Sequence, residues 1–488
     1  MNGPFLSMML FFIYTIMMIY SARSGFYDTY NMEDFFVAGR SLNAFYSTAT
    51  FLATWFSAAS ILGLGGSIYI YGISSIIYSI IPWFCGAIFL ILISRRLREE
   101  FSLFTYPEFF SIRYKSKLMQ LSTALIMISS YIFYITMQIK GFGLVMSILL
   151  NIPYTAAIFL LYLYILYTTF GGLYSVVKTD AINAFIIFFS FCAFGIYIII
   201  QNKGAVNLIQ KAALISTFPV SGWNIKTPPG GLLDIFCKGL QPPAYLFTSF
   251  FGWGLGLAAN PQYVIRIISA KDAATSRKMI IYSILLLSVI YTFIVFGALG
   301  LRTLIPTSDP VGNIDEIIPT LLSHVSPNYL TGIILVGIIA SSISTANSEL
   351  LLIANSFTYD ILKNFRKGVS EEELINLNRI VIALAGTLSL ILSFNPPKNL
   401  IEFGGNIWGI FSSSTFVALY AGIFLKSATR SAAEASFISG LLAYFLFFMI
   451  QDFTHSPIIM YIHPGLPGFA ASLIAFIIAE WRSKRGEH

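Results

Sequence analysis

Long apolar segments separated by short polar ones run along the whole chain. A helix crosses a bilayer core of about 30 Å with about 20 residues, and the segments reach that length. About thirteen of them are present, at 4–22, 43–71, 75–94, 118–150, 153–174, 180–201, 243–267, 279–302, 328–361, 377–395, 402–426, 431–451 and 466–481. The first is preceded by no basic residue and followed by Arg23, the reverse of a signal peptide, so we expect it to remain as a span. The pattern predicts an all-α polytopic membrane protein in which residues 1–488 form one transmembrane domain.

Two of the segments contain residues that interrupt helices. The second contains Gly63, Gly65 and Gly66, and the seventh contains Asn260 followed by Pro261. Broken helices at membrane depth persist only where they line a cavity or are buried in protein. Because the two segments lie five apart, we expect a pair of inverted repeats of five spans each. The repeats would cover 43–201 and 243–426, with 4–22 and 431–481 outside them. Glycine used only for close helix packing is the alternative.

Composition agrees with a membrane protein and excludes several functions. Hydrophobic residues make up 57% of the 488 residues, charged residues make up 10%, and the mean hydropathy is +0.78. A soluble globular protein of this length would carry more charge. The four histidines and three cysteines follow no metal-binding spacing, and the sequence has no nucleophile or nucleotide-binding motif. We therefore expect no enzymatic activity.

Basic residues are distributed unevenly between alternate loops. Of the 29 Lys and Arg residues, 22 fall on one side of the predicted membrane, Arg266 among them, and 6 on the other, while Lys140 lies inside a span. Cytoplasmic loops carry the basic excess, so the amino terminus is predicted outside and the carboxyl terminus in the cytoplasm. Because these charges are dispersed among loops, nucleic acid is not an expected partner. The expected partners are the lipid bilayer and a small organic solute, with no obligatory protein partner.

A cluster of hydroxyl and amide side chains lies in the ninth segment, at residues 341–348 (S-S-I-S-T-A-N-S). On a helix, Ser341 shares a face with Ser344 and Thr345, three and four residues later. Hydroxyls and freed main-chain carbonyls supply the neutral oxygens that a dehydrated sodium ion requires, and broken helices of transporters expose such carbonyls. The cluster is therefore a candidate cation site. The alternative is that small hydroxyl residues only let helices approach closely.

Three ionisable residues lie within or at the ends of apolar segments. Lys140 precedes Leu150 by ten residues, roughly 15 Å along a helix, which is a long reach for a snorkelling ammonium. Intramembrane ionisable residues are functional candidates, so Lys140, together with Gln138, is predicted to meet a substrate carboxylate. Snorkelling, or pairing with an acidic residue such as Glu349, is the alternative; Glu349 itself is given no role. Asp180 opens its segment, where a helix N-cap is a sufficient explanation.

Several stretches resemble one known family, in the order in which that family carries them. They are E-D-F-F-V-A-G-R-S-L at 33–42, Y-P-E-F-F-S-I-R-Y at 106–114, Y-T-T-F-G-G-L-Y-S-V-V-K-T-D at 167–180, W-G-L-G at 253–256 with Asn260-Pro261, the S-T pair at 344–345 and Y-D-I-L-K at 359–363. In these stretches the chain resembles the sodium:solute symporter family, most closely its bacterial proline and pantothenate branches. The resemblance implies a leucine-transporter-type (LeuT) fold, Na+ as the coupling ion and a location in the bacterial inner membrane.

The resemblance also implies a sodium site between the second and ninth spans. Carried over position by position, its ligands would be the main-chain carbonyls of Ala53, Phe56 and Ser341 and the hydroxyls of Ser344 and Thr345. In the family, the residue that matches Asp180 lies on the cytoplasmic sodium path, and some members use it in a second sodium site. Here that site would include Asn347 and Ser348 with Ser344, although Asn347 stands where a hydroxyl is expected.

The substrate pocket departs from the proline branch. That branch has an Asp and a Trp in the second span and a Tyr in the seventh, at positions occupied here by Trp55, Ala59 and Leu257. These differences argue against proline, while some carboxylate-transporting relatives carry a basic residue in the span of Lys140. The candidate substrate residues are Trp55, Ser57, Gln138, Lys140, Trp253 and Asn260.

The function expected from the sequence is sodium-coupled symport of a small organic solute, a carboxylate such as pantothenate or an amino acid, by alternating access. The alternative is a membrane solute sensor that uses a symporter-like domain with a separate signalling partner.

Overall fold

A computed structural model describes residues 3–309, 313–366, 368–454 and 456–486. Within these ranges the chain is helical and forms no strand. The elements of the first part are α1 (Gly3–Tyr27), α2 (Met32–Val37), η1 (Ala38–Arg40), α3 (Ala44–Trp55), η2 (Ala59–Gly63), α4 (Leu64–Tyr71), η3 (Ile76–Ile80), α5 (Ile81–Glu100), α6 (Glu108–Tyr114), α7 (Lys117–Leu150), α8 (Tyr154–Thr169), α9 (Gly172–Gln201) and α10 (Ala205–Leu214).

The second part is equally helical. Its elements are η4 (Gly231–Leu233), η5 (Cys237–Gly239), α11 (Pro243–Ser249), η6 (Phe250–Gly254), α12 (Leu255–Ala258), α13 (Pro261–Ser269), α14 (Ala273–Leu304), η7 (Ile314–Glu316), α15 (Ile317–Val325), α16 (Asn328–Asn355), η8 (Ser356–Leu362), α17 (Lys363–Phe365), α18 (Glu371–Leu392), α19 (Leu400–Ser414), α20 (Phe416–Phe424), α21 (Arg430–Phe453), α22 (Pro457–Met460) and α23 (Gly465–Gly486).

The predicted apolar segments all lie in these helices, but the predicted number of spans is not confirmed. Among the described residues, nine helices are long and apolar enough to cross a membrane, and eleven spans result if each of two bent pairs counts as one. The bent pairs are α3 with η2–α4, at 58°, and α19 with α20, at 44°. The remaining predicted spans correspond to α8, which is shorter, and to the fragmented stretch from α11 to α13.

The second predicted span is broken, although not at its glycines. Helix α3 ends at Phe56, whose ψ of 105° is extended, and helical structure resumes at Ala59. Gly63 and Gly66 are helical residues that allow close packing. A Cβ at Gly66 would lie 2.1 Å from the carbonyl oxygen of Ile314, and one at Gly63 would lie 2.8 Å from the nitrogen of Ile401. The packing role therefore accounts for these glycines, and the break precedes them in the chain.

The seventh predicted span breaks where the sequence places Asn260 and Pro261. The chain at Asn260 is extended, and Pro261 occupies the first turn of α13, where its missing N–H costs nothing. The Asn260 side chain caps this helix by accepting from the nitrogen of Gln262 at 3.2 Å, and it also accepts from the Tyr131 hydroxyl at 2.6 Å. An interhelical hydrogen bond thus fixes the break.

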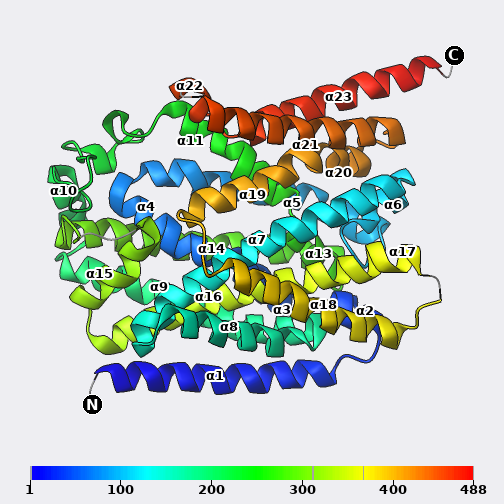
Figure 1. Cartoon of the computed structure of the whole chain (residues 1–488). Helices are drawn as coiled ribbons and strands as arrows, with labels where there is room; N and C mark the ends of the chain where they lie inside the picture. Colours follow the sequence, from blue (N-terminus) through cyan, green and yellow to red (C-terminus); the bar gives the residue numbers. More distant parts are fainter. Residues whose placement is uncertain (1–2, 310–312, 367, 455, 487–488) are drawn as a thin grey trace.

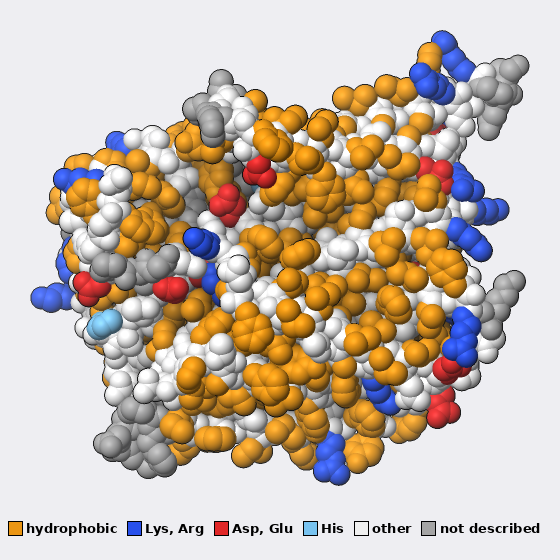
Figure 2. All heavy atoms as spheres, viewed as in Figure 1, with side chains coloured by type: hydrophobic (Ala, Val, Ile, Leu, Met, Phe, Trp, Pro, Cys, Tyr) orange, Lys and Arg blue, Asp and Glu red, His pale blue; other side chains and the backbone are white. Residues whose placement is uncertain are grey.

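Helix α16 lies at the centre of the protein, and every residue from Ile334 to Asn355 is buried. It packs against α1, α7, α9 and α18 (Figure 1). Helices α21 and α23 pack on each other at one side of the molecule, opposite α1, and the two chain termini lie at opposite ends. Figure 2 shows mostly hydrophobic side chains across the middle of this face, with Lys and Arg concentrated towards both ends. This is the distribution expected of a protein surrounded by lipid.

Replacing Asn260 tests the capped break. We expect Asn260→Ala to lower stability by about 1 kcal/mol or more, because the N-cap bond and the bond to Tyr131 are both lost. Asn260→Asp retains an acceptor and should lose less. The measurement is the apparent melting temperature of each purified variant in detergent. The comparison variant is Tyr131→Phe, which keeps the Asn260 cap but removes the hydroxyl that donates to Asn260 and accepts from the Gln262 nitrogen. A melting temperature unchanged in Asn260→Ala would contradict the capping role.

Candidate functional site

The predicted sodium ligands meet where the end of α3 faces α16. The Ser344 hydroxyl donates to the Ala53 carbonyl at 2.8 Å and to the Ser341 carbonyl at 3.1 Å. The Thr345 hydroxyl lies 3.1 Å from the Ser341 carbonyl and 3.4 Å from that of Thr54. Phe56 is the residue at which α3 ends. These residues are all fully buried, so the structure places uncharged oxygens from two helices around one point in the interior.

The chemistry of this set suits an alkali cation. The donors are hydroxyl and main-chain carbonyl oxygens, which hard monovalent cations prefer over nitrogen or sulfur. Because α3 stops at Phe56, carbonyls in its last turn have no later helical N–H to accept from, and they remain available to an ion. The hydroxyls that now donate to them would turn their lone pairs towards a bound cation instead.

A second polar group lies next to this set, around Arg266. The Arg266 guanidinium is almost fully buried, donates to the Ser348 hydroxyl and approaches the Asp180 carboxylate to 3.9 Å. Asp180 also accepts from the Thr50 hydroxyl at 2.7 Å, and Ser348 contacts the Thr54 hydroxyl at 3.0 Å. Asp180 and Ser348 are therefore brought together by a fixed positive charge.

Other predictions about this region need correction. Asp180 is not an N-cap, because α9 begins at Gly172, well before it. In the described part of the chain, Asn347 forms no hydrogen bond or ion pair with Arg266 or Asp180; its side-chain oxygen accepts from Thr168 at 2.8 Å and from Thr169 at 3.2 Å, both in α8. Arg266, counted among loop residues by the charge pattern, lies inside α13 and is buried.

Lys140 forms an ion pair with a residue that sequence reasoning did not consider. Its ammonium lies 2.5 Å from the Asp315 carboxylate and 2.8 Å from the Pro397 carbonyl. Asp315 belongs to the short η7 turn, and it accepts at 3.2 Å from the main-chain nitrogen of Leu400, at the start of α19. The partner of Lys140 is thus Asp315 and not Glu349, whose two carboxylate oxygens have no hydrogen-bond partner among the described residues.

Burial raises the pKa of the Asp315 carboxyl, while the charge of Lys140 acts in the opposite direction. The pair holds together three segments that are distant in sequence, namely α7, η7 and the start of α19. It therefore fixes the loop before α15 against the transmembrane body.

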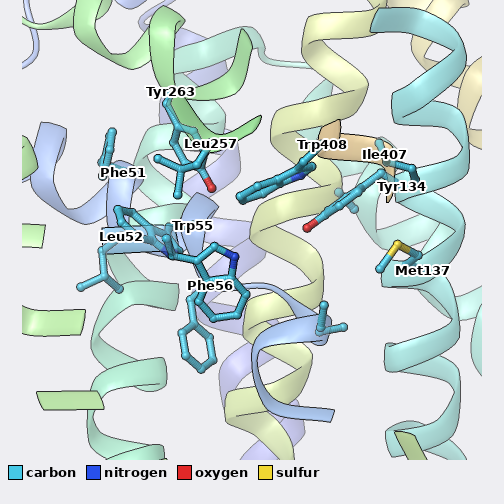
Figure 3. Packing of buried hydrophobic residues seen from close by; sticks show 14 of the residues in the cluster. Phe51, Leu52, Trp55, Phe56, Tyr134, Met137, Leu257, Tyr263, Ile407 and Trp408 are labelled. Carbon is cyan, nitrogen blue, oxygen red and sulfur yellow. The ribbon is translucent and has the colours of Figure 1, made fainter. Parts of the chain in front are cut away.

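Aromatic side chains form a closed ring in the interior beside the break in α3. Neighbouring members of the ring have centroids 4.8 to 6.0 Å apart. In order around the ring they are Trp55, Tyr263, Trp408, Trp253, Trp83, Tyr291 and Phe84. Figure 3 shows Trp55, Tyr263 and Trp408 facing one another from different helices. We call these seven residues the aromatic cage.

The tryptophans of the aromatic cage carry buried hydrogen-bond donors. The indole nitrogens of all four are buried. Those of Trp55, Trp253 and Trp408 lie beside the hydroxyls of Tyr291, Tyr78 and Tyr134, at poorer geometry than a full hydrogen bond, and that of Trp83 has no partner among the described residues. Buried donors without partners are rare and call for an explanation, of which a ligand is one. The side-chain nitrogen of Gln138 is also unpartnered, while its oxygen accepts from the main-chain nitrogen of Ala58 at 3.0 Å, inside the break of α3.

Comparison with known proteins assigns the chain to a family. The model of the sodium:solute symporter family matches residues 35–440, which is most of the chain. The chain belongs to this family. The osmoregulated proline transporter OpuE of Bacillus subtilis is 25% identical to this symporter over 487 residues, covering 97% of it and 94% of the relative. The sodium/pantothenate symporter of Haemophilus influenzae is 26% identical over 466 residues, and the alignment covers 93% of this chain and 91% of the relative.

Solved structures agree on the fold. A Na+-coupled sialic acid symporter in a substrate-bound outward-open state superposes with a TM-score of 0.81 at 18% identity, with 97% of each chain covered. The nucleobase-cation-symport-1 transporter Mhp1 in a closed conformation superposes with a TM-score of 0.54 at 16% identity. This superposition covers 92% of the chain and 94% of Mhp1. The predicted family and LeuT-type fold are thus confirmed for this symporter, as is its being a multi-pass membrane transporter and not an enzyme.

The predicted substrate residues of the symporter fall into separate places. Trp55 and Trp253 belong to the aromatic cage, and Gln138 faces the break in α3. The main-chain nitrogen of Ser57 donates to the neighbouring Ser60 hydroxyl at 3.3 Å, so this residue also lies at the break. Asn260 caps α13, and Lys140 pairs with Asp315. The substrate role of these six residues stays a prediction.

Sequence reasoning missed most of the aromatic cage of the symporter. Trp83, Trp408, Tyr263 and Tyr291 come from α5, α19, α13 and α14, and nothing in their local sequence distinguishes them from helix-packing aromatics. One signal was present: the chain has only 6 tryptophans, and four of them lie in separate apolar segments.

Removing one partner of the Lys140–Asp315 pair tests its structural role. We expect Lys140→Met to lower stability by about 3–5 kcal/mol, because the Asp315 carboxylate is left buried and unpaired. The double variant Lys140→Met, Asp315→Asn removes both charges and should recover most of the loss. The measurement is the apparent melting temperature in detergent.

The control is Lys398→Met, which removes an exposed lysine near the same loop. A melting temperature that stays as low in the double variant as in Lys140→Met would contradict the pairing. Loss of solute binding in the double variant, with its melting temperature restored, would instead support the substrate role of Lys140.

Proposed function

We propose that the protein is a sodium-coupled symporter that imports a small organic solute across the bacterial plasma membrane by alternating access. The observation that carries this proposal is the contact of the Ser344 hydroxyl with the Ala53 carbonyl at the end of α3. It supports a cation site that bridges a broken helix and the central helix α16. The second support comes from similar proteins, since the sialic acid symporter of like fold is Na+-coupled and the pantothenate relative is named as a sodium symporter.

In the proposed mechanism, sodium entering from outside binds the carbonyls of Ala53, Phe56 and Ser341 and the hydroxyls of Ser344 and Thr345. The ion replaces interhelical hydrogen bonds with stronger ion–dipole contacts, which hold the end of α3 against α16 in one geometry. Since α3 also contributes Trp55 to the aromatic cage, fixing α3 positions a side chain that lines the proposed solute site. Sodium and solute are coupled because each stabilises the same arrangement of α3.

Release of sodium towards the cytoplasm is proposed to pass Asp180 and Ser348, with Asn347 on the same helix. The fixed charge of Arg266 beside Asp180 and Ser348 disfavours a long stay of a second cation there, and thus favours release. The ion moves down its gradient and the membrane potential, and one charge crossing the membrane is worth about 2.3 kcal/mol per 100 mV.

The orientation proposed for the membrane follows the basic excess, with the amino terminus outside and the carboxyl terminus in the cytoplasm. The positions of the two termini at opposite ends of the molecule support an odd number of crossings. The solute proposed on the basis of the relatives is a carboxylate or an amino acid, since their names include proline and pantothenate.

Direct binding of radioactive 22Na+ to purified protein tests the sodium site without knowledge of the solute. We expect Ser344→Ala and Thr345→Ala each to weaken binding about tenfold or more, since each removes an oxygen ligand of a charged group. The matched control is Ser342→Ala. The Ser342 hydroxyl is buried on the same helix, but among the described residues it donates only to the Ile338 carbonyl of the preceding turn, at 3.1 Å. Equal binding in all three variants would refute the site. In vesicles, uptake driven as well by a potassium gradient as by a sodium gradient would refute the coupling.

A further inference from the structure

We propose that a groove between α3, α9 and α14 binds an anionic phospholipid, with one acyl chain in the groove and the phosphate at Arg277 and Lys278. We call it the lipid groove. It is separate from the proposed sodium site and from the aromatic cage, and no step of the proposed transport cycle uses it. The shape of the groove and the charges at one of its ends carry the proposal.

The lipid groove is a hollow of about 630 Å³ in the lipid-facing surface of the helix bundle. Sites for small ligands in proteins typically measure about 300–1,000 Å³. Its floor includes Ala49 and Leu52 of α3, which are buried. Its walls include Phe185 and Phe189 of α9 and Leu285 of α14, each more than half exposed. Small or buried side chains between large exposed ones thus make a channel in a surface that would otherwise be flat.

The length and the chemistry of the lipid groove suit one acyl chain. On α3 its lining runs from Ala44 to Leu52. At 1.5 Å per residue this is about 12 Å, and one leaflet of the hydrocarbon core is about 15 Å thick. Apart from the hydroxyls of Thr48 and Tyr282, the lining side chains are hydrocarbon. The groove therefore offers apolar surface over most of one leaflet.

Two basic side chains lie at the end of the lipid groove that the charge pattern predicts to be cytoplasmic. Lys278 shares a face of α14 with Tyr282 and Leu285, four and seven residues later, and Arg277 precedes it. Both basic side chains are exposed, and neither forms a hydrogen bond or an ion pair with another described residue. They come directly before the apolar segment 279–302, which places them near the level of the lipid headgroups.

The acidic side chains at this end already have partners. Asp272 caps α14 by accepting from the Thr275 nitrogen at 2.6 Å, and it lies 4.0 Å from the Lys271 ammonium. On the side of α9, Asp28 is paired with Lys178. The uncompensated charge beside the groove is therefore positive. An anionic phosphate at the surface of the membrane complements it, and a zwitterionic headgroup does so less well.

A second apolar groove provides a comparison within the same protein. It measures about 480 Å³ and lies between α7, α19 and α21, with Phe133, Ile407 and Phe445 in its lining. No Lys or Arg lies within four sequence positions of any residue that lines it. We expect this second groove to accept acyl chains without preference for a headgroup. The charges on α14 therefore distinguish the lipid groove from an ordinary lipid-facing hollow.

A lipid in this groove contacts the half of the broken span that precedes the break. Leu52 of the floor is next to Ala53, whose carbonyl is a proposed sodium ligand, and Thr50 of the same helix donates to Asp180 at 2.7 Å. Helix α3 packs against α9 and α14, and an acyl chain along all three adds dispersion contacts to this arrangement. We expect the bound lipid to stabilise α3 in the position described.

Native mass spectrometry of the purified full chain tests the headgroup. The probes are phosphatidylglycerol, which is anionic, and phosphatidylcholine, which is zwitterionic, with identical acyl chains. We expect the first phosphatidylglycerol to bind about tenfold or more tightly than the first phosphatidylcholine. Arg277→Gln and Lys278→Gln should each weaken phosphatidylglycerol binding about fivefold and leave phosphatidylcholine binding unchanged.

The control is Lys117→Gln, which removes an exposed lysine at the start of α7, on the same predicted side of the membrane. Equal affinity for the two lipids would overturn the proposal. An equal loss in Lys117→Gln and Lys278→Gln would also overturn it, because attraction to the surface charge in general would then explain the binding.

Filling the lipid groove tests the position of the acyl chain. Ala184→Phe places a ring in the groove from the partly exposed side of α9 and should weaken phosphatidylglycerol binding about tenfold or more. The control is Ala156→Phe, which adds the same ring to an exposed position of α8 outside the groove. An unchanged melting temperature without added lipid shows that each variant is folded. Unchanged phosphatidylglycerol binding in Ala184→Phe would overturn the proposal, and the variants of Arg277 and Lys278 test the headgroup contact independently of packing.

The lipid groove and the proposed symport can fail separately. Selective phosphatidylglycerol binding without any 22Na+ binding that depends on Ser344 would support the groove and refute the sodium site. Sodium binding that depends on Ser344, without preference for phosphatidylglycerol, would leave symport standing and refute the lipid groove.

Discussion

The contact between the end of α3 and the hydroxyl face of α16 is the interaction on which the rest of the site depends. In hydrocarbon, a broken helix is tolerated only if protein groups satisfy the main chain that it frees. The Ser344 hydroxyl does so at the Ala53 carbonyl, and Gln138 does so at the Ala58 nitrogen on the other side of the gap. Side chains of α7 and α16 thus satisfy the main-chain groups on both sides of the break and stabilise it. The same bonds place uncharged oxygens together in the interior, where a monovalent cation would find them.

Close packing around this break uses small residues where the chain has little room. Gly63 and Gly66 follow the break and lie against Ile401 and Ile314, so the resumed helix touches the start of α19 and the η7 turn through its backbone. Those two segments are in turn tied together by Asp315, which pairs with Lys140 and accepts from Leu400. Glycine contacts and a buried ion pair therefore both hold the η7 turn and the start of α19 in place. They define the position of the loop before α15 relative to the broken helix.

Buried charges follow the rule that each needs a partner, with one exception. Lys140 has Asp315, and Arg266 lies near Asp180 and donates to Ser348. Glu349 alone has two carboxylate oxygens without partners among the described residues, close in sequence to the hydroxyls of the proposed sodium site. Each buried polar group without a partner calls for an explanation, of which a bound ion or water is one.

The sequence by itself determined the class of protein, the helical segments, the two interrupted spans and the hydroxyl face of the ninth. These features are local: apolar length, a proline after Asn260, and hydroxyls three and four residues apart are read directly along the chain. Resemblance to a family then predicted its fold, which the comparisons confirm. The number of spans, the exact place of the first break and the partners of Lys140 and Arg266 were decided only by the tertiary structure. Asp315 is 175 residues from Lys140, and the aromatic cage draws on six helical elements, α3, α5, η6, α13, α14 and α19. No local sequence pattern predicts these contacts between distant residues, because they depend on how whole helices pack.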